Sequence, residues 1–277
     1  MALSQTEFQY IQTLVRNVAA IVIEPGKEYL VESRLSPLAR QEGFETISRL
    51  IENVWNKPVN GMHQKIVDAM TTNETSFFRD IHPFDAMRQQ VIPNLMTRRR
   101  AVRRLNIWCG AASTGQEPYS VAMLLREHFP ELNGWTIRIL ATDINKEVLE
   151  RARSGRFRQM EVNRGLPASM LVKYFRERAA MWELRDEIRN MVEFRELNLA
   201  TPWPPMARPD MVLLRNVMIY FDIPTKKEIL ARLHGFIAPG GYLVLGSAET
   251  TLNLDERFDR MVCGKAVCYS PRLPATK

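Results

Sequence analysis

Cysteine is scarce in this chain, and its scarcity excludes two kinds of protein. The three cysteines among 277 residues are Cys109, Cys263 and Cys268. An odd number at these spacings provides neither a disulfide framework nor a zinc-binding pattern. The sequence therefore predicts a protein of a reducing compartment that holds no metal.

Long hydrophobic runs are also missing. No apolar stretch approaches the roughly 20 residues that a membrane-spanning helix needs. The first ten residues, MALSQTEFQY, lack the basic and then apolar layout of a signal peptide. Internal repeats and low-complexity tracts are absent as well. We expect a cytoplasmic protein that does not insert into membranes.

The composition that is present suits a folded protein with an anionic partner. Hydrophobic residues make up 45% and charged residues 25% of the chain, enough for a sizeable core and two domains. The net charge is +7. This excess favours nucleic acid, a membrane surface or an acidic protein as the partner, although a basic surface without a function remains the alternative.

The N-terminal part is predicted to be helical. Ser4 and Glu7 have the spacing of a capping box, and apolar residues then recur with the helical period. Further helices are expected over residues 27–43, 46–55 and 61–71, with Pro37 marking a kink or a late start of the first. We therefore expect a small helical domain over residues 1–72, followed by a linker over residues 73–84.

Residues 85–277 alternate between strands and helices, which is typical of a doubly wound parallel sheet. The final strand is expected to be an antiparallel edge strand. The stretch 154–192 is too long for a crossover and predicts an inserted subdomain. Strands are expected at 105–108, 136–142, 192–197, 211–215, 242–245 and 266–270, and helices at 118–128, 146–153 and 225–236.

The stretch NIWCGAASTGQEPYS, residues 106–120, is a glycine turn between a strand and a helix, a common place for a nucleotide. The lysine of a phosphate-binding P-loop is missing, and so is the G-x-G-x-x-G spacing of a dinucleotide site. Glu117 would also repel a phosphate. A cofactor with a cationic end, such as S-adenosylmethionine, removes that objection, and Asp143 after the next strand can accept hydrogen bonds from its ribose.

Three further stretches, NETSFFRD (73–80), CGAASTGQEPYS (109–120) and RNVMIYFD (215–222), together resemble the CheR family of chemotaxis receptor methyltransferases. IAPGGYLVLG, before a late strand, is similar to Rossmann-like methyltransferases in general. The resemblance covers essentially the whole chain. It implies an α/β fold: a Rossmann-like S-adenosylmethionine-dependent methyltransferase domain with a small helical N-terminal domain and an inserted small β-subdomain.

The resemblance implies a protein-glutamate O-methyltransferase that leaves S-adenosylhomocysteine as product. It assigns catalytic roles to Arg79, which would grip a carboxylate of cofactor or substrate, and to Tyr220, which would position the methyl or the acceptor. For three of the implied cofactor-binding residues, a purely structural role is the simpler alternative: a turn residue at Asn198, a helix cap at Thr75 and a solvent-facing charge at Arg215. The cofactor-binding residues that it implies are Asn73, Thr75, Arg79, Gly110, Glu117, Asp143, Asn198, Leu199, Arg215 and Asn216.

The chemistry explains why the motifs lack a His/Asp pair. Glutamate, with a pKa of about 4.3, is already a nucleophilic carboxylate at neutral pH, so no general base is required. The enzyme has to align carboxylate oxygen, methyl carbon and sulfur, and to exclude water. His82 is accordingly expected to be structural.

The implied partner is the cytoplasmic domain of methyl-accepting chemoreceptors, whose methylation helices are rich in glutamate. Lys27, Arg34 and Arg40 match the family's basic receptor-facing helix, but Pro37 replaces another basic residue. Some members grip a C-terminal receptor peptide through a glycine-rich loop in the insertion. Residues 175–182 contain no glycine, so we expect the protein to work independently of such a tether. We also expect a monomer.

Two other functions compete with this interpretation. An RNA methyltransferase would use the same cofactor turn, with the basic stretch MTRRRAVRR (96–104) as its RNA contact. No appended RNA-binding module is visible, so no nucleic acid is expected as partner. An adaptor that binds the cofactor and docks on receptors without turnover would not need Arg79 and Tyr220.

Overall fold

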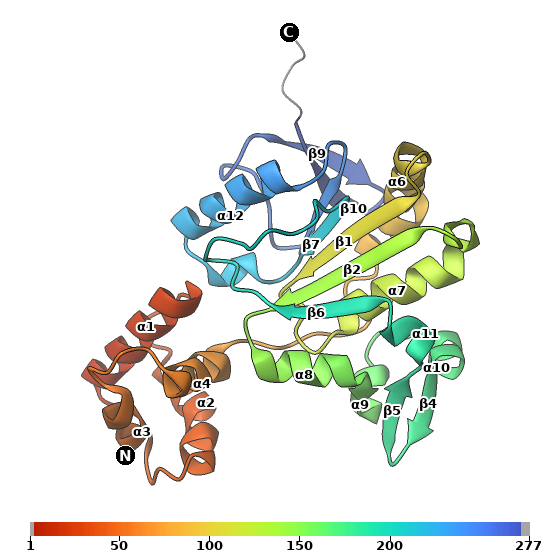
Figure 1. The fold of residues 1–277 in the computed structure, drawn as a ribbon. Helices are drawn as coiled ribbons and strands as arrows, with labels where there is room; N and C mark the ends of the chain where they lie inside the picture. The colour runs from red at the N-terminus through yellow and green to blue at the C-terminus, as the bar shows by residue number, and fades with distance from the viewer. Residues whose placement is uncertain (1–2, 273–277) are drawn as a thin grey trace. The chain divides into compact units, whose positions relative to one another are not determined.

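The computed structural model describes residues 3–272, which form two units (Figure 1). The helical unit runs to Thr72 and also includes Tyr220–Thr225. The sheet unit comprises Asn73–Ile219 and the chain from Lys226 onwards. The sequence analysis assigned residues 220–225 to the α/β domain. They group with the helices instead, because Val22 N–H donates to the Tyr220 carbonyl at 2.9 Å and Arg16 pairs with Asp222 at 2.8 Å.

The helical unit contains α1 (Gln5–Ala19), α2 (Glu28–Gln41), α3 (Ile47–Val54) and α4 (Gly61–Met70). The predicted capping box of α1 is confirmed: Ser4 N–H donates to Glu7 Oε2 at 2.8 Å, and Glu7 N–H donates to Ser4 Oγ at 3.3 Å. The apolar stripe of α1 is buried. Since α2 begins at Glu28 and passes through Pro37, the late start of this helix was wrong.

The sheet unit is built on a seven-stranded sheet of order β6-β2-β1-β7-β8-β10-β9. The first five are parallel, and every residue of β7 and β8 is buried, as expected of strands covered on both faces. The strands are β1 (Arg104–Gly110), β2 (Thr136–Asp143), β6 (Val192–Glu196), β7 (Met211–Leu214), β8 (Tyr242–Leu245), β9 (Phe258–Cys263) and β10 (Ala266–Pro271).

Helical segments accompany this sheet, and α7 and α8 lie on one side of it (Figure 1). The stretch between residues 82 and 99 is helical, which the sequence analysis did not identify. No helix within residues 3–272 has the length and apolar character to cross a bilayer. The segments are α5 (His82–Ala86), η1 (Met87–Val91), α6 (Ile92–Arg99), α7 (Gln116–His128), η2 (Pro130–Leu132), α8 (Lys146–Ser154), η3 (Met218–Tyr220) and α12 (Ile223–Phe236).

The last strand was predicted correctly as antiparallel but wrongly as an edge strand. β10 lies between β8 and β9, with antiparallel pairing to both. β9 was missed, because Asp259 and Arg260 interrupt its apolar residues. A two-residue turn, Gly264 and Lys265, joins β9 to β10.

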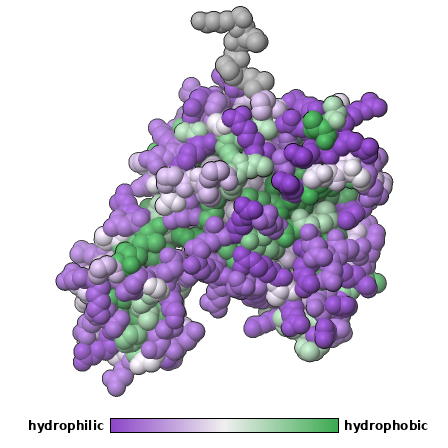
Figure 2. Space-filling view, in the orientation of Figure 1, coloured by the Kyte–Doolittle hydropathy of each residue, from purple (hydrophilic) through white to green (hydrophobic). Residues whose placement is uncertain are grey.

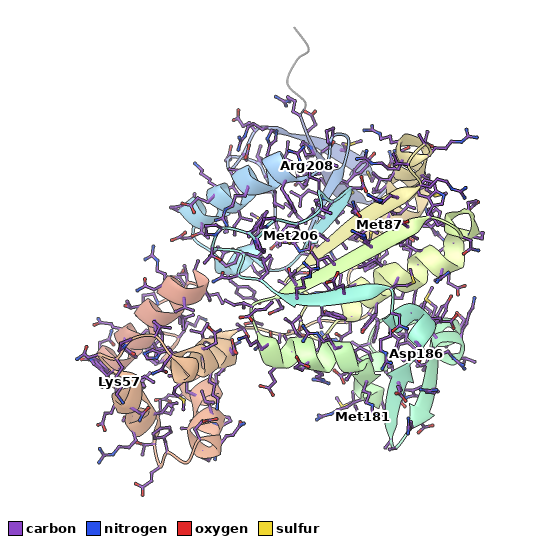
Figure 3. The ribbon with its side chains drawn as sticks, in the orientation of Figure 1. Lys57, Met87, Met181, Asp186, Met206 and Arg208 are labelled. Carbon is purple, nitrogen blue, oxygen red and sulfur yellow. The ribbon has the colours of Figure 1, made fainter. Side chains whose placement is uncertain are left out.

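The insertion forms a three-stranded antiparallel sheet, β3-β5-β4, as the predicted fold class requires. Ala179 and Ala180, both with positive φ, form the turn between β4 and β5, and Figure 3 shows Met181 just after it. The elements are β3 (Arg156–Phe157), α9 (Gln159–Val162), α10 (Ala168–Tyr174), β4 (Phe175–Arg178), β5 (Met181–Leu184) and α11 (Asp186–Arg189).

The insertion packs against the first motif. The buried ring of Phe77 contacts the rings of Phe157 and Phe175, with centroid distances of 5.0 Å and 5.8 Å. Gly165, between α9 and α10, has φ of +85°, and a Cβ there would lie 2.0 Å from the Phe77 carbonyl oxygen. The insertion therefore fixes the backbone of the motif, and Phe77 is a core residue.

The loop that follows β6 and the end of α12 lie beside strands β1, β2 and β6. A cavity of about 500 Å³ lies there, lined by residues such as Trp108, Leu140 and Met206. Figure 2 shows hydrophobic residues at the surface of the sheet unit among hydrophilic ones. Met206 and Arg208 mark the loop after β6 in Figure 3.

The topology predicts where a ligand binds. From β1 the chain continues to β2 on one side, and it later returns as β7 on the other. Ligands of open α/β sheets bind at the carboxyl ends of the strands where the order reverses. The strand ends that meet here are Gly110, Asp143 and Leu214.

Candidate active site

The glycine turn closes tightly at the end of β1. Ala112 N–H donates to the Thr142 carbonyl at 2.9 Å, and Gly115, which has φ of 94°, precedes α7. A Cβ on Gly110 would lie 2.7 Å from Leu214 Cδ1. A side chain at position 110 would therefore force the buried Leu214 side chain to move, whether or not Gly110 also contacts a cofactor.

Asp143 fixes this turn from the end of β2. Its Oδ2 accepts from Ser113 N–H at 2.8 Å and its Oδ1 from Asn145 N–H at 3.0 Å. Burial raises the pKa of the Asp143 carboxyl, while these backbone donors favour its ionised form. The sequence analysis predicted that the Asp143 carboxylate accepts hydrogen bonds from the ribose of the cofactor. Each of its oxygens has a backbone donor already, and Ile144 N–H also donates to this carboxylate, so about one of its four acceptor positions remains for a ligand.

Arg215, directly after β7, joins the three motifs. Its Nη1 donates to Glu117 Oε2 at 2.6 Å, and its Nη2 donates to the Arg79 carbonyl at 2.7 Å and to Asp80 Oδ2 at 3.1 Å. The side chain is 1% exposed, so the alternative of a solvent-facing charge was wrong. We call Arg215, Glu117, Arg79 and Asp80 the arginine cluster.

Glu117 is the charged acceptor of this cluster. Burial raises its pKa above the ordinary value, and the positive charges of Arg215 and Arg79 act in the opposite direction. Only Oε2 receives a hydrogen bond from the described residues. The second oxygen is thus available to a ligand, and an ionised carboxylate at the start of α7 suits a cationic group.

Glu249, which the sequence analysis missed, holds the loop after β7. Its Oε1 accepts from the backbone N–H of Val217 and Ile219, and its Oε2 from those of Asn216 and Gly246, at 2.7 to 3.3 Å. One carboxylate therefore ties the Asn216 loop to the end of β8. The only local signal is an acidic residue three positions after the glycine that ends a buried strand.

The remaining cofactor candidates lie in the sheet unit. The Asn73 carbonyl accepts from Ser113 Oγ at 2.8 Å, which brings the first motif to the glycine turn. Asn198 Oδ1 accepts from Ala200 N–H at 2.9 Å, so it does have the turn role. Thr75 caps no helix, because the segment around it is irregular. Leu199 is buried.

Four predicted residues belong to the helical unit: Tyr220, Lys27, Arg34 and Arg40. The Arg34 guanidinium donates to the Thr71 carbonyl at 3.2 Å and to Thr72 Oγ1 at 2.8 Å. Burial lowers the pKa of Arg34. This arginine therefore binds the chain just after α4, whereas Lys27 and Arg40 are exposed. The catalytic role of Tyr220 stays a prediction.

The donor set fits S-adenosylmethionine. Two largely buried carboxylates, Glu117 and Asp143, follow neighbouring strands and suit an ammonium group and ribose hydroxyls. A phosphate would face the negative charge of Glu117. When bound, this cofactor supplies an electrophilic methyl group on a sulfonium. Within residues 3–272, no three His, Cys, Asp or Glu side chains are grouped to hold a metal ion.

Comparison with known proteins agrees with this geometry. Residues 6–71 match the family model of the CheR methyltransferase all-alpha domain, and residues 73–267 match that of the CheR methyltransferase SAM-binding domain. Chemotaxis protein methyltransferase 1 of Pseudomonas aeruginosa is 36% identical over 274 residues, which cover 97% of this chain and 99% of that protein.

Two further relatives carry the name chemotaxis protein methyltransferase. The protein of Escherichia coli is 35% identical over 93% of this chain and 89% of its own length. That of Vibrio parahaemolyticus is 32% identical over 97% and 98%. The chain therefore belongs to the CheR family and is an S-adenosylmethionine-dependent methyltransferase of chemotaxis.

Proposed function

We propose that this enzyme methylates glutamate carboxylates on the cytoplasmic helices of chemoreceptors, in the cytoplasm, and releases S-adenosylhomocysteine. The observation that carries the proposal is the arginine cluster, which brings Arg79 and Glu117 together at the strand ends where such sheets bind ligands. The site candidates include no histidine. A glutamate acceptor explains this, because it is already ionised at neutral pH.

The side chains divide the work in this proposal. Glu117 and Asp143 hold the cationic and hydroxyl groups of the cofactor. Arg79 is half-buried, and its Nη1 donates to the Glu74 carbonyl at 3.0 Å. The other guanidinium donors remain for the carboxylate of the cofactor or of the substrate. The rate acceleration then comes from alignment of the carboxylate oxygen, methyl carbon and sulfur and from the exclusion of water.

The Arg79→Ala variant is expected to transfer methyl groups at least about 100-fold more slowly than the wild type, because it loses the donor for a carboxylate. The assay follows labelled S-adenosylmethionine into receptor signalling fragments and scores base-labile label. Arg126→Ala, at the far end of α7 from Glu117, is the matched control.

Either of two outcomes would contradict the proposal. Undiminished transfer by Arg79→Ala would remove Arg79 from the site. Firm cofactor binding by the wild type without label on any receptor would favour the adaptor or the RNA enzyme.

Fragments with and without the receptor's C-terminal peptide should react equally, since the β4–β5 turn consists of two alanines.

Acidification is expected to weaken cofactor binding. Because burial raises the pKa of Glu117 above 4.5, this carboxylate takes up its proton at a higher pH than an exposed glutamate and then no longer attracts an ammonium group. Acidification has the opposite effect on the folding stability of the unliganded protein. Ionised Glu117 costs stability, and this cost is relieved as the pH falls through the raised pKa.

Calorimetric titration with S-adenosylhomocysteine between pH 7.5 and 5 would measure the effect. The Glu117→Gln variant should bind more weakly at pH 7.5 and lose less affinity on acidification, with Asp143 causing the rest. A wild-type affinity that stays constant down to pH 5 would contradict the role of Glu117.

The contacts of the basic stretch 96–104 weaken the RNA alternative. Arg98 donates to the Gly240 carbonyl at 3.1 Å, and Arg99 pairs with the buried Asp210. These two arginines therefore support the sheet unit. For the receptor, we propose that Lys27, just before α2, and Arg40 within it provide exposed positive charges, with Arg34 in a structural role.

A further inference from the structure

A second cavity lies at the carboxyl end of β8, next to the arginine cluster. Its volume is about 330 Å³, and it is bounded by the start of α5, the loop after β8 and the β9–β10 hairpin. The polar side chains that line it include Asp80, His82, Ser247, Glu249, Arg260 and Lys265. None of the functions assigned above uses Arg260 or Lys265.

The acidic groups of this cavity already have partners within the sheet unit. Asp80 pairs with Arg215 at 3.1 Å, and the Glu249 carboxylate accepts four backbone N–H groups. The two basic groups of the cavity have no such partners. Arg260 and Lys265 are exposed and have no ion pair or side-chain hydrogen bond with any residue from 3 to 272. The cavity therefore presents two cations, Arg260 and Lys265, that can pair with a ligand.

The position of the cavity relates it to the methyl acceptor. The cofactor candidates Glu117 and Asp143 follow β1 and β2, whereas this cavity lies beyond β7, at the ends of β8 and β10. Asp80 belongs both to the cavity and to the arginine cluster. A substrate that reached the cluster across this cavity would come close to Arg260 and Lys265, which line it.

We propose that this cavity binds a second acidic side chain of the substrate helix, a glutamate or aspartate near the residue that is methylated. This inference rests on the proposed function and adds to it a specificity site. On a helix, residues three or four apart lie about 5–6 Å from each other, so one acidic residue can occupy the cavity while its neighbour faces the cluster. Two cations suit a carboxylate and disfavour a basic or apolar neighbour.

The test compares two charge-reversal variants of the full chain. Arg260→Glu with Lys265→Glu changes the cavity, and Arg100→Glu with Arg104→Glu makes the same change of charge near the start of β1, at the amino end of the parallel strands. We expect the cavity variant to raise KM for a receptor fragment about tenfold with kcat little changed, and the control to stay within about twofold. S-adenosylhomocysteine affinity should be the same in both.

Three outcomes separate the possibilities. A cavity variant with the KM of the control would overturn this inference and leave the proposed function intact. Absence of methyl transfer by the wild type would instead overturn the proposed function. Receptor fragments with their flanking acidic residues changed to glutamine should abolish the difference between wild type and variant. If the double reversal fails to fold, Arg260→Gln with Lys265→Met provides the same comparison at smaller amplitude.

Discussion

Replacing Arg215 by methionine is expected to lower the free energy of unfolding by about 3–5 kcal/mol. The guanidinium is 1% exposed and pairs with two carboxylates, those of Glu117 and Asp80. Its removal leaves Glu117 buried without its partner and releases the Arg79 carbonyl from the end of β7. Denaturant unfolding measures the stability, and calorimetric titration with S-adenosylhomocysteine should show weaker binding.

A double variant distinguishes charge from packing. Adding Glu117→Gln to Arg215→Met removes the unpaired carboxylate, so part of the lost stability should return while cofactor binding stays weak. Arg215→Lys retains the charge but not the planar fork that reaches two carboxylates and a carbonyl, and an intermediate stability is expected. Unchanged stability of Arg215→Met would show that the arginine cluster is not a structural centre.

The Glu249→Gln variant should lose about 2–3 kcal/mol of stability, although it is nearly isosteric. The carboxylate accepts hydrogen bonds on both oxygens, whereas a glutamine amide offers one oxygen and an NH₂ group that faces two backbone donors. Whichever way the amide is turned, two of the four N–H groups lose their acceptor. The loop with Asn216 then becomes less fixed, and methyl transfer should slow as well.

Glu256→Gln is the appropriate control for this change. Glu256 is an exposed glutamate farther along the same loop region, so its neutralisation should alter stability by less than about 0.5 kcal/mol. Thermal unfolding of both variants, together with initial rates, makes the comparison. Equal unfolding temperatures for the two would refute the anchoring role of Glu249.

Local patterns in the sequence were sufficient for much of this fold. The capping box of Ser4 and Glu7 involves residues three apart, and the buried runs of β7 and β8 identify themselves by their apolar residues. The position of Asp143 at a strand end followed in the same way. β9 lacked such a pattern, because its exposed Asp259 and Arg260 obscure the strand period.

Contacts between distant parts of the chain were beyond such patterns. Arg215 meets Glu117 and Asp80 across 98 and 135 positions, and nothing near Arg215 indicates that it is buried. Similarly, the four hydrogen bonds of Glu249 depend on how β7 and β8 end side by side. The family resemblance identified Arg215 as important, but its central position among three motifs became apparent only in three dimensions.

The packing of the insertion against Phe77 has an evolutionary consequence. Its inner side, with Phe157, Phe175 and Gly165, is constrained by the methyl-transfer motif that it supports. The same packing constraint does not apply to the β4–β5 turn at Ala179 and Ala180. The sequence of the hairpin tip can therefore change, or accept a grafted turn, without disturbing the packing that supports the motif.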